Sequence, residues 1–323
     1  MTTAIVGVSQ PTSLSNLDER ARKYARKSKA TNTQRAYRAA WSEFQNFAAG
    51  RGQSSFPASA ASVIDYITQL ADSGAKVSTI QVKLAAIASA HRAARQPDPT
   101  TDEDVRVVMA GIRRALRTAP TKKAPATLGQ IRKMVAALPE TLAGKRDKAL
   151  LLIGFAGAFR RSELVDVDVA DIRLDGKATI TVKRSKTDQE GQGQVKVIPG
   201  LADKTICPVE ALQAWLDAGQ VKSGPVFRQI DKWGNLRAAR LSAQSVALIV
   251  KAAAEKAGLE PRQFAGHSLR SGFITEAASA GVESRDIMAQ TGHKSEAFMR
   301  GYIQDAGRGA SAAVRAAFGE ARD

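Results

Sequence analysis

The sequence is poor in cysteine, histidine and long apolar runs, and each shortage excludes a class of protein. Its one cysteine, Cys207, rules out an intrachain disulfide and favours a reducing, cytoplasmic setting. The longest apolar run, 149–159, is shorter than the ~20 residues that a membrane span needs, and no secretory leader opens the chain. Three histidines and one cysteine are too few for a metal cage, and no phosphate-cradling GxxxxGKS or GKT motif is present. We therefore expect no metal, no cofactor and no membrane attachment.

Positive charge is what the chain has in excess. Its 48 Lys and Arg against 31 Asp and Glu give a formal net charge of +17 and an isoelectric point near 10.2. Up to Pro125, 19 basic residues against 9 acidic ones contribute +10 of that charge. Such an excess points to a polyanionic partner, most simply nucleic acid, with an anionic membrane surface as the weaker alternative.

The length of 323 residues suits two domains. Residues 1–29 predict a flexible basic tail, either solvated or lying on DNA phosphates. Residues 30–118 have the apolar spacing of an all-helical domain, and residues 119–126, APTKKAPA, have the composition of a linker. We place the second domain at 127–304 and a C-terminal tail with a short helix at 305–323.

Two helical patterns of the first domain bear on its role. One begins with Thr31 or Thr33 as its cap and carries an aromatic stripe that we expect in the core, formed by Tyr37, Trp41, Phe44 and Phe47. The other runs from Asp102 to about Arg117 and separates its arginines from its apolar stripe. A basic face is often merely solvated, but an excess of one sign favours DNA-backbone contact. The candidates are Arg106, Arg113, Arg114, Arg117 and, in the linker, Lys122 and Lys123.

One histidine of the first domain, His91, lies on the apolar face of a helix that we expect to begin after Ser78 or Thr79. A lone histidine on such a face is more often packed than catalytic. We therefore assign His91 a structural role.

The second domain is predicted to be mostly helical with a small antiparallel sheet. Helical signals occur at Thr127, 147–159, Pro208 and Ser242. Two β-rich runs, 178–183 and 194–198, flank the polar segment RSKTDQEGQG. This pattern predicts a hairpin with Lys186 near its tip.

The segment from Gly266 to Tyr302 gathers side chains suited to chemistry on a phosphodiester. Cleavage through a protein nucleophile needs fixed cations for the non-bridging oxygens and a nucleophile that can lose its proton. Arg160 and Arg270 fit a paired clamp, since a guanidinium binds phosphate with two parallel hydrogen bonds. Tyr302 fits the nucleophile, with its proton lost to a base such as His267 or eased by the positive field of the clamp.

The departing oxygen must also gain a proton. Lys186, on the predicted hairpin, fits the general acid, and His293 fits a hydrogen-bond donor to a phosphate oxygen. Each of these residues alone has an ordinary structural explanation. Their order along the chain is what carries information.

That order resembles the motif set of the tyrosine recombinases, also called phage-type integrases. AFRRSEL resembles the first arginine box, with Arg160 as its catalytic arginine and Glu163 as its acidic partner. RSKT resembles the lysine hairpin, GHSLR the HxxR box, and TGH followed by Tyr302 the box that ends in the nucleophile. The resemblance spans roughly 31–303. Phe159, Arg161 and Thr291 depart from the usual residues and put local packing in question.

The resemblance implies an all-helical N-terminal core-binding (SAM-like) domain and a mostly helical α/β catalytic domain. It implies a site-specific recombinase that cuts duplex DNA through a 3′-phosphotyrosyl link and works as a homotetramer on paired inverted-repeat sites, without cofactor. The short N-terminal tail suits a Cre-like or Xer-like enzyme, and the C-terminal tail is expected to dock on a neighbour or on its own subunit. The alternatives are a type IB topoisomerase-like activity and an inactive DNA-binding regulator of the same fold.

Overall fold

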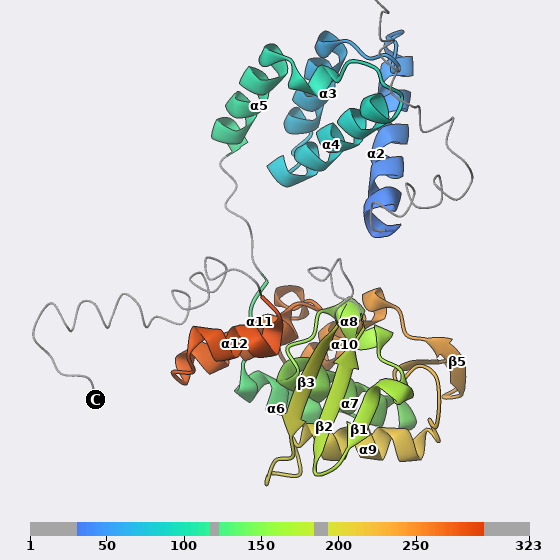
Figure 1. Ribbon diagram of the computed structural model, residues 1–323, viewed down its shortest axis with the longest axis vertical. Coiled ribbons are helices and arrows are strands. Elements are labelled where there is room, and N and C mark those ends of the chain that lie inside the picture. The colour runs from blue at the N-terminus through green and yellow to red at the C-terminus, as the bar shows by residue number, and fades with distance from the viewer. Residues whose placement is uncertain (1–30, 117–122, 184–192, 294–323) are drawn as a thin grey trace, which may run out of the picture. The chain divides into compact units, whose positions relative to one another are not determined.

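The computed structural model describes residues 31–116, 123–183 and 193–293, which belong to two compact units (Figure 1). One unit lies within Met1–Thr121 and the other within Lys122–Asp323. Each unit has its own hydrophobic core. The mainly helical, two-domain fold expected from the sequence is confirmed.

The first unit contains four α-helices in its described part: α2 (Thr31–Gly50), α3 (Ala60–Asp72), α4 (Val77–Ala93) and α5 (Glu103–Leu116). A 3₁₀ turn, η2 (Pro99–Thr101), precedes α5. Helix α2 packs on α4, and α3 packs on α5. Three members of the predicted aromatic stripe are confirmed, since Phe44 is fully buried and Trp41 and Phe47 pack against the same core. The fourth, Tyr37, is half-buried and does not belong to this core cluster.

His91 is a buried structural residue, as predicted. Its Nδ1 lies 2.9 Å from the carbonyl oxygen of Ile87, and its Nε2 accepts a 2.9 Å hydrogen bond from the backbone N–H of Ala58. Donation by Nδ1 to the carbonyl and acceptance at Nε2 require the neutral ring. Helix α4 begins at Val77, one residue before the expected cap.

Helix α5 separates charge from apolar surface in the way its sequence predicts. Val105, Met109 and Ile112 are buried, whereas the described arginines of the opposite face are exposed, namely Arg106, Arg113 and Arg114. An exposed basic face on a packed helix is available to a polyanion.

The described part of the second unit contains α6 (Leu128–Ala136), α7 (Leu142–Ala156), α8 (Arg161–Asp166), α9 (Pro208–Ala218), α10 (Ala243–Lys256), α11 (Ser268–Ser279) and α12 (Ser284–Thr291). One antiparallel sheet has the order β1 (Ile172–Leu174), β2 (Lys177–Val182), β3 (Gln194–Pro199), and a second pairs β4 (Arg228–Ile230) with β5 (Leu236–Arg240). Short 3₁₀ turns lie at η3 (Val169–Asp171) and η4 (Pro261–Gln263).

The predicted hairpin strands are confirmed: β2 pairs with β3 from Lys177 opposite Pro199 to Val182 opposite Gln194. Strands β1, β4 and β5 were not predicted, because three to five residues are too few for a clear alternation.

The helix predicted at 147–159 is wrong at both ends. Helix α7 begins at Leu142, because the Thr141 side chain caps it by accepting from the Gly144 N–H at 3.2 Å. It ends at Ala156, and Ala158 then adopts a left-handed backbone with φ of 47°.

The described part of the predicted linker packs onto the second unit. Ala124 N donates to the Gln263 carbonyl and Ala126 N to the Ser268 carbonyl, both at 2.9 Å. Ala126 is fully buried. No helix in the described ranges is both long and apolar enough to cross a bilayer.

Candidate active site

Helix α11 carries Arg270 into the interior of the second unit. The Arg270 side chain is fully buried, and its Nη1 donates a 2.7 Å hydrogen bond to the carbonyl oxygen of Ala158. Its Nη2 lies 3.0 Å from Nε2 of His293. A buried guanidinium is costly unless its hydrogen bonds are made, so these contacts fix both its position and its plane.

Arg160 stands at the N-cap of α8 and is held by Glu163 one turn later. Oε1 of Glu163 accepts from Nη1 of Arg160 at 2.6 Å, and Oε2 accepts from the Arg160 backbone N–H at 3.0 Å. The Glu163 side chain is 3% exposed, whereas that of Arg160 is 18% exposed. The carboxylate therefore anchors the arginine from the protein side, while part of the Arg160 side chain stays exposed.

His293 follows α12, beyond Gly292 in the left-handed conformation. Thr291 Oγ1 donates to the Ile287 carbonyl at 2.7 Å and lies 2.9 Å from Nδ1 of His293. The hydroxyl proton is thus used, so Nδ1–H of His293 donates to Thr291 and Nε2 accepts from Arg270. Burial, and then the charges of Arg270 and Arg160, lower the pKa of His293 to about 4. A neutral ring at pH 7 agrees with these hydrogen bonds.

His267 is the N-cap residue of α11, and its side chain keeps an exposed surface. Partial burial, followed by the charges of Arg270, Arg160 and Arg161, lowers the pKa of His267 below its ordinary value. The ring is consequently neutral at pH 7 and is able to accept a proton.

Five of the predicted residues therefore form one group, the arginine–histidine cluster, made of Arg160, Glu163, His267, Arg270 and His293. The predicted residues Lys186, Tyr302, Arg117 and Lys122, and the tails 1–29 and 305–323, lie outside the described residues. Lys123 is exposed, and its Nζ donates to the Arg262 carbonyl at 2.7 Å.

The three departures from the expected motifs are accommodated. Phe159 is buried, Arg161 is exposed, and Thr291 is buried with its hydroxyl engaged on both sides. The hydroxyl of Thr291 thus supplies the acceptor that sets the His293 tautomer.

Sequence reasoning missed Lys196 of β3. Its side chain is fully buried, its Nζ donates to the Gln290 carbonyl, and the same Nζ lies 5.1 Å from the centre of the Phe159 ring. Burial is the main cause that lowers the pKa of Lys196 to about 8, Glu163 opposes it, and Arg270 and Arg160 reinforce it. Lys196 stands between two valines, and nothing in the sequence distinguishes it from an exposed lysine of a strand. Its burial therefore could not be predicted from the sequence.

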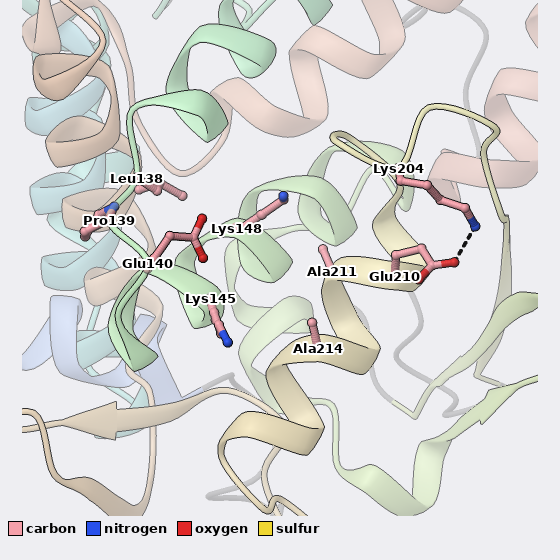
Figure 2. A pocket seen from close by; sticks show the side chains of 10 residues that line it. Leu138, Pro139, Glu140, Lys145, Lys148, Lys204, Glu210, Ala211 and Ala214 are labelled. Carbon is pink, nitrogen blue, oxygen red and sulfur yellow. Dashed lines mark hydrogen bonds and ion pairs between the residues drawn. The ribbon is translucent and has the colours of Figure 1, made fainter.

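Two cavities lie outside the cluster. An apolar groove of about 330 Å³ is lined by side chains that include Phe155, Val197, Leu201 and Phe273. A smaller cavity of about 230 Å³ lies between α7 and α9, and its lining includes Glu140, Lys145 and Lys148 together with Lys204 and Glu210, which form an ion pair (Figure 2). Neither cavity is lined by a residue of the cluster.

Comparison with known protein families gives two matches. The model of the Phage integrase family matches residues 127–308. The model of the Phage integrase N-terminal SAM-like domain matches residues 23–97.

Among curated proteins, the chain is 41% identical over 293 residues to the "Integrase/recombinase xerD homolog" of Selenomonas ruminantium, covering 89% of this chain and 86% of the relative. It is 25% identical over 298 residues to "Recombinase cre" of Escherichia phage P1, covering 86% and 83% of the two chains.

Solved structures share the fold. The XerH site-specific recombinase bound to a palindromic difH substrate matches with a TM-score of 0.66 and 17% identity, covering 94% of this chain and 84% of that one. A lambda integrase dimer bound to a COC′ core site matches with a TM-score of 0.59 and 18% identity, covering 89% and 75%.

Proposed function

This chain belongs to the phage integrase family of tyrosine site-specific recombinases, and from that premise we propose that it exchanges DNA strands through a covalent 3′-phosphotyrosyl intermediate. The observation that supports this most directly is the arginine–histidine cluster. In it, Glu163 anchors a partly exposed Arg160, and neutral histidines flank a fully buried Arg270. Fixed guanidinium groups suit the non-bridging oxygens of a phosphodiester in its transition state.

Tyr302 is the nucleophile in this proposal. Its Oη attacks the phosphorus atom, the bond to the 5′ oxygen breaks, and the DNA keeps its 3′ end on the tyrosine. His267, whose lowered pKa keeps the ring neutral and its acceptor nitrogen unprotonated at pH 7, accepts the tyrosine proton, and Lys186 protonates the leaving 5′ oxygen. A 5′ hydroxyl from the partner duplex then attacks the phosphotyrosine and restores the phosphodiester.

In this scheme His293 acts through Arg270. Both nitrogens of the His293 ring are engaged within the protein, by Arg270 and by Thr291. A hydrogen bond from His293 to phosphate would require the contact with Arg270 to open. Orientation of the Arg270 guanidinium is the role that the described contacts support.

The substrate that we propose is duplex DNA with an inverted-repeat site, bound by a homotetramer on two paired sites in the cytoplasm. Two structures with the same fold, XerH bound to a palindromic substrate and a lambda integrase dimer bound to its core site, are complexes with DNA and support a DNA substrate for this chain. In this chain the proposed backbone contacts are Arg106, Arg113, Arg114, Arg117, Lys122 and Lys123. The C-terminal tail, 305–323, is proposed to serve subunit contact.

A nicked suicide duplex tests the proposal. The probe is built on the inverted repeats that flank the gene, so that the cleaved strand diffuses away and the protein–DNA adduct accumulates. We expect an adduct with the wild type and with Tyr37→Phe, and none with Tyr302→Phe. An adduct formed by Tyr302→Phe would refute the assignment of the nucleophile, and the absence of any wild-type adduct would refute the enzymatic mechanism.

A further inference from the structure

The buried ammonium of Lys196 carries an energetic cost. Moving an ammonium out of water costs several kcal/mol unless strong partners replace its hydration. In this protein Lys196 is fully buried, and its described contacts are the Gln290 carbonyl and the face of the Phe159 ring. A methionine would fill a similar volume without the cost of burying a charge, so packing alone does not explain a lysine at this position.

The carbonyl that Lys196 binds belongs to the last turn of α12. Carbonyls of a last helical turn lack intrahelical partners, and a cation is favoured beside them. A second side chain of β3 binds the same turn, since Nε2 of Gln194 donates to the Ala289 carbonyl at 2.7 Å. On the other side, Nε2 of Gln290 donates to the Ala156 carbonyl at 3.1 Å. The end of α12 is thus tied to β3 and to the end of α7.

His293 follows α12 by two residues. Thr291, the last residue of the helix, binds Nδ1 of His293, and Gly292 ends the helix in the left-handed conformation with φ of 71°. An added Cβ at Gly292 would lie 2.6 Å from Oε1 of Gln194, so β3 approaches the turn closely. A shift of the α12 end would therefore move the His293 ring relative to Arg270.

We propose that Lys196 is a positioning residue: its buried ammonium binds the end of α12 and thereby holds His293 in contact with Arg270. The effect of Lys196 on DNA cleavage rests on the proposed function. Its effect on the position of the His293 ring does not depend on that function. Lys196 touches no substrate in this proposal.

The charged groups around Lys196 come from α8, with its N-cap residue, and from α11. Glu163 on α8 stabilises its charge, whereas Arg160 at the start of α8 and Arg270 on α11 oppose it. His293 feels the Lys196 charge as the smallest of the causes that lower its own pKa. With a pKa of about 8, Lys196 is charged at pH 7. It loses its charge as the pH rises above about 8.

The structural part is tested by NMR titration of the imidazole signals, which needs no DNA. The chain has three histidines, so His→Gln variants assign the signals. We expect the His293 pKa to rise by about one unit or more toward its ordinary value in Lys196→Met, because the ring leaves its buried place beside Arg270. Lys196→Arg keeps a cation and is expected to leave the titration near that of the wild type. Gln194→Ala loosens the same turn without removing a charge and is expected to shift His293 in the same direction.

The catalytic part is tested with the suicide duplex in single turnover. We expect Lys196→Met to form the adduct more slowly by on the order of 10²-fold at unchanged DNA affinity, since misplacing an oriented group has effects of that size. Lys196→Arg is expected to recover most of the rate. The ratio of the wild-type rate to the Lys196→Arg rate is expected to fall as the pH rises through about 8, because a guanidinium does not lose its proton. Lys177→Met, which removes an exposed lysine of β2, is the matched control and is expected to match the wild type.

The two proposals fail in different ways. Without any wild-type adduct the proposed function fails, and the titration still decides whether Lys196 holds His293. If the adduct forms and Lys196→Met leaves both its rate and the His293 titration unchanged, the positioning role is refuted. Should Lys196→Met not fold, the His293 titration and the rate of adduct formation are measured in Gln194→Ala. If neither changes there, the end of α12 does not hold His293 in place.

Discussion

The guanidinium of Arg270 donates a 2.7 Å hydrogen bond to the carbonyl of Ala158, a residue 112 positions earlier in the chain. Ala158 has a left-handed backbone and lies two residues before Arg160. The contact thus ties the segment that carries Arg160 to the side chain of Arg270. It makes Arg270 a structural link as well as a proposed phosphate ligand.

Arg270→Lys is expected to lose both functions. An ammonium has no planar fork, so it cannot span the Ala158 carbonyl and Nε2 of His293 together. We expect the free energy of unfolding to fall by about 2–4 kcal/mol, because hydrogen bonds to a buried charge are lost. Adduct formation is expected to slow by about 10²–10³-fold. Urea unfolding and single-turnover cleavage measure the two effects, and unchanged values in both would show that a point charge suffices.

Glu163→Gln is expected to loosen Arg160. The carboxylate is almost fully buried and binds both the backbone and the side chain of Arg160. Because Arg160 keeps some solvent exposure, we expect a loss of about 2 kcal/mol in the free energy of unfolding, below the 3–5 kcal/mol typical of a fully buried pair. The matched control is Glu210→Gln, which breaks the exposed pair with Lys204 and is expected to leave the free energy of unfolding close to that of the wild type, because solvent screens an exposed pair. Equal effects of the two substitutions in urea unfolding would contradict a buried anchor.

His293 is expected to make the fold sensitive to acid. Its pKa of about 4 in the folded protein lies below the 6.5 of the unfolded chain, so the unfolded state binds the additional proton between these values. Stability therefore falls as the pH drops from about 6.5 toward 4. The two pKa values correspond to about 3.4 kcal/mol in full, and solvent screening of the half-buried ring reduces this to about 2 kcal/mol. Urea unfolding at pH 7 and pH 4.5 is compared for the wild type and for His293→Gln. The difference between the two proteins gives the contribution of His293 to the loss of stability in acid. A pH dependence that is identical in both proteins would exclude the depressed pKa.

Gly272→Ala is expected to disrupt the contact between α11 and the segment that precedes α6. A Cβ at Gly272 would lie 1.9 Å from the carbonyl oxygen of Ala126, a backbone atom that cannot rotate away. We expect a loss of about 3 kcal/mol in thermal or urea unfolding. Gly129→Ala in α6 is the control, because nothing lies within 4 Å of its Cβ, and it is expected to stabilise by about 0.5 kcal/mol. A neutral Gly272→Ala would mean that the 123–126 segment is not held against α11.

Local signals explain why much of the fold was predictable. Ser59, Thr127 and Ser242 each cap a helix through the side-chain hydrogen bond that their residue type favours. The burial of Phe44 and of His91 follows from apolar spacing on one helical face. Such features depend on neighbours within a few positions, and the sequence states those neighbours directly.

In strand β3 the local sequence pattern predicts the wrong buried face. Its alternation of Val195, Lys196 and Val197 would predict valines inside and lysine outside. In the structure the two valines are 59% and 48% exposed, and Lys196 is fully buried. The inward face is chosen by what lies beside it, namely the Gln290 carbonyl and the Glu163 carboxylate, which come from elements far away in sequence.

The sequence by itself determined the family and the types and order of the cluster residues, because arginine, glutamate and histidine at these spacings carry their chemistry in their side chains. Only the tertiary structure decided that Arg270 reaches Ala158, that Thr291 sets the ring of His293, and that Lys196 is turned inward. Burial and hydrogen bonding are properties of the neighbours that folding brings together, and those neighbours are separated along the chain.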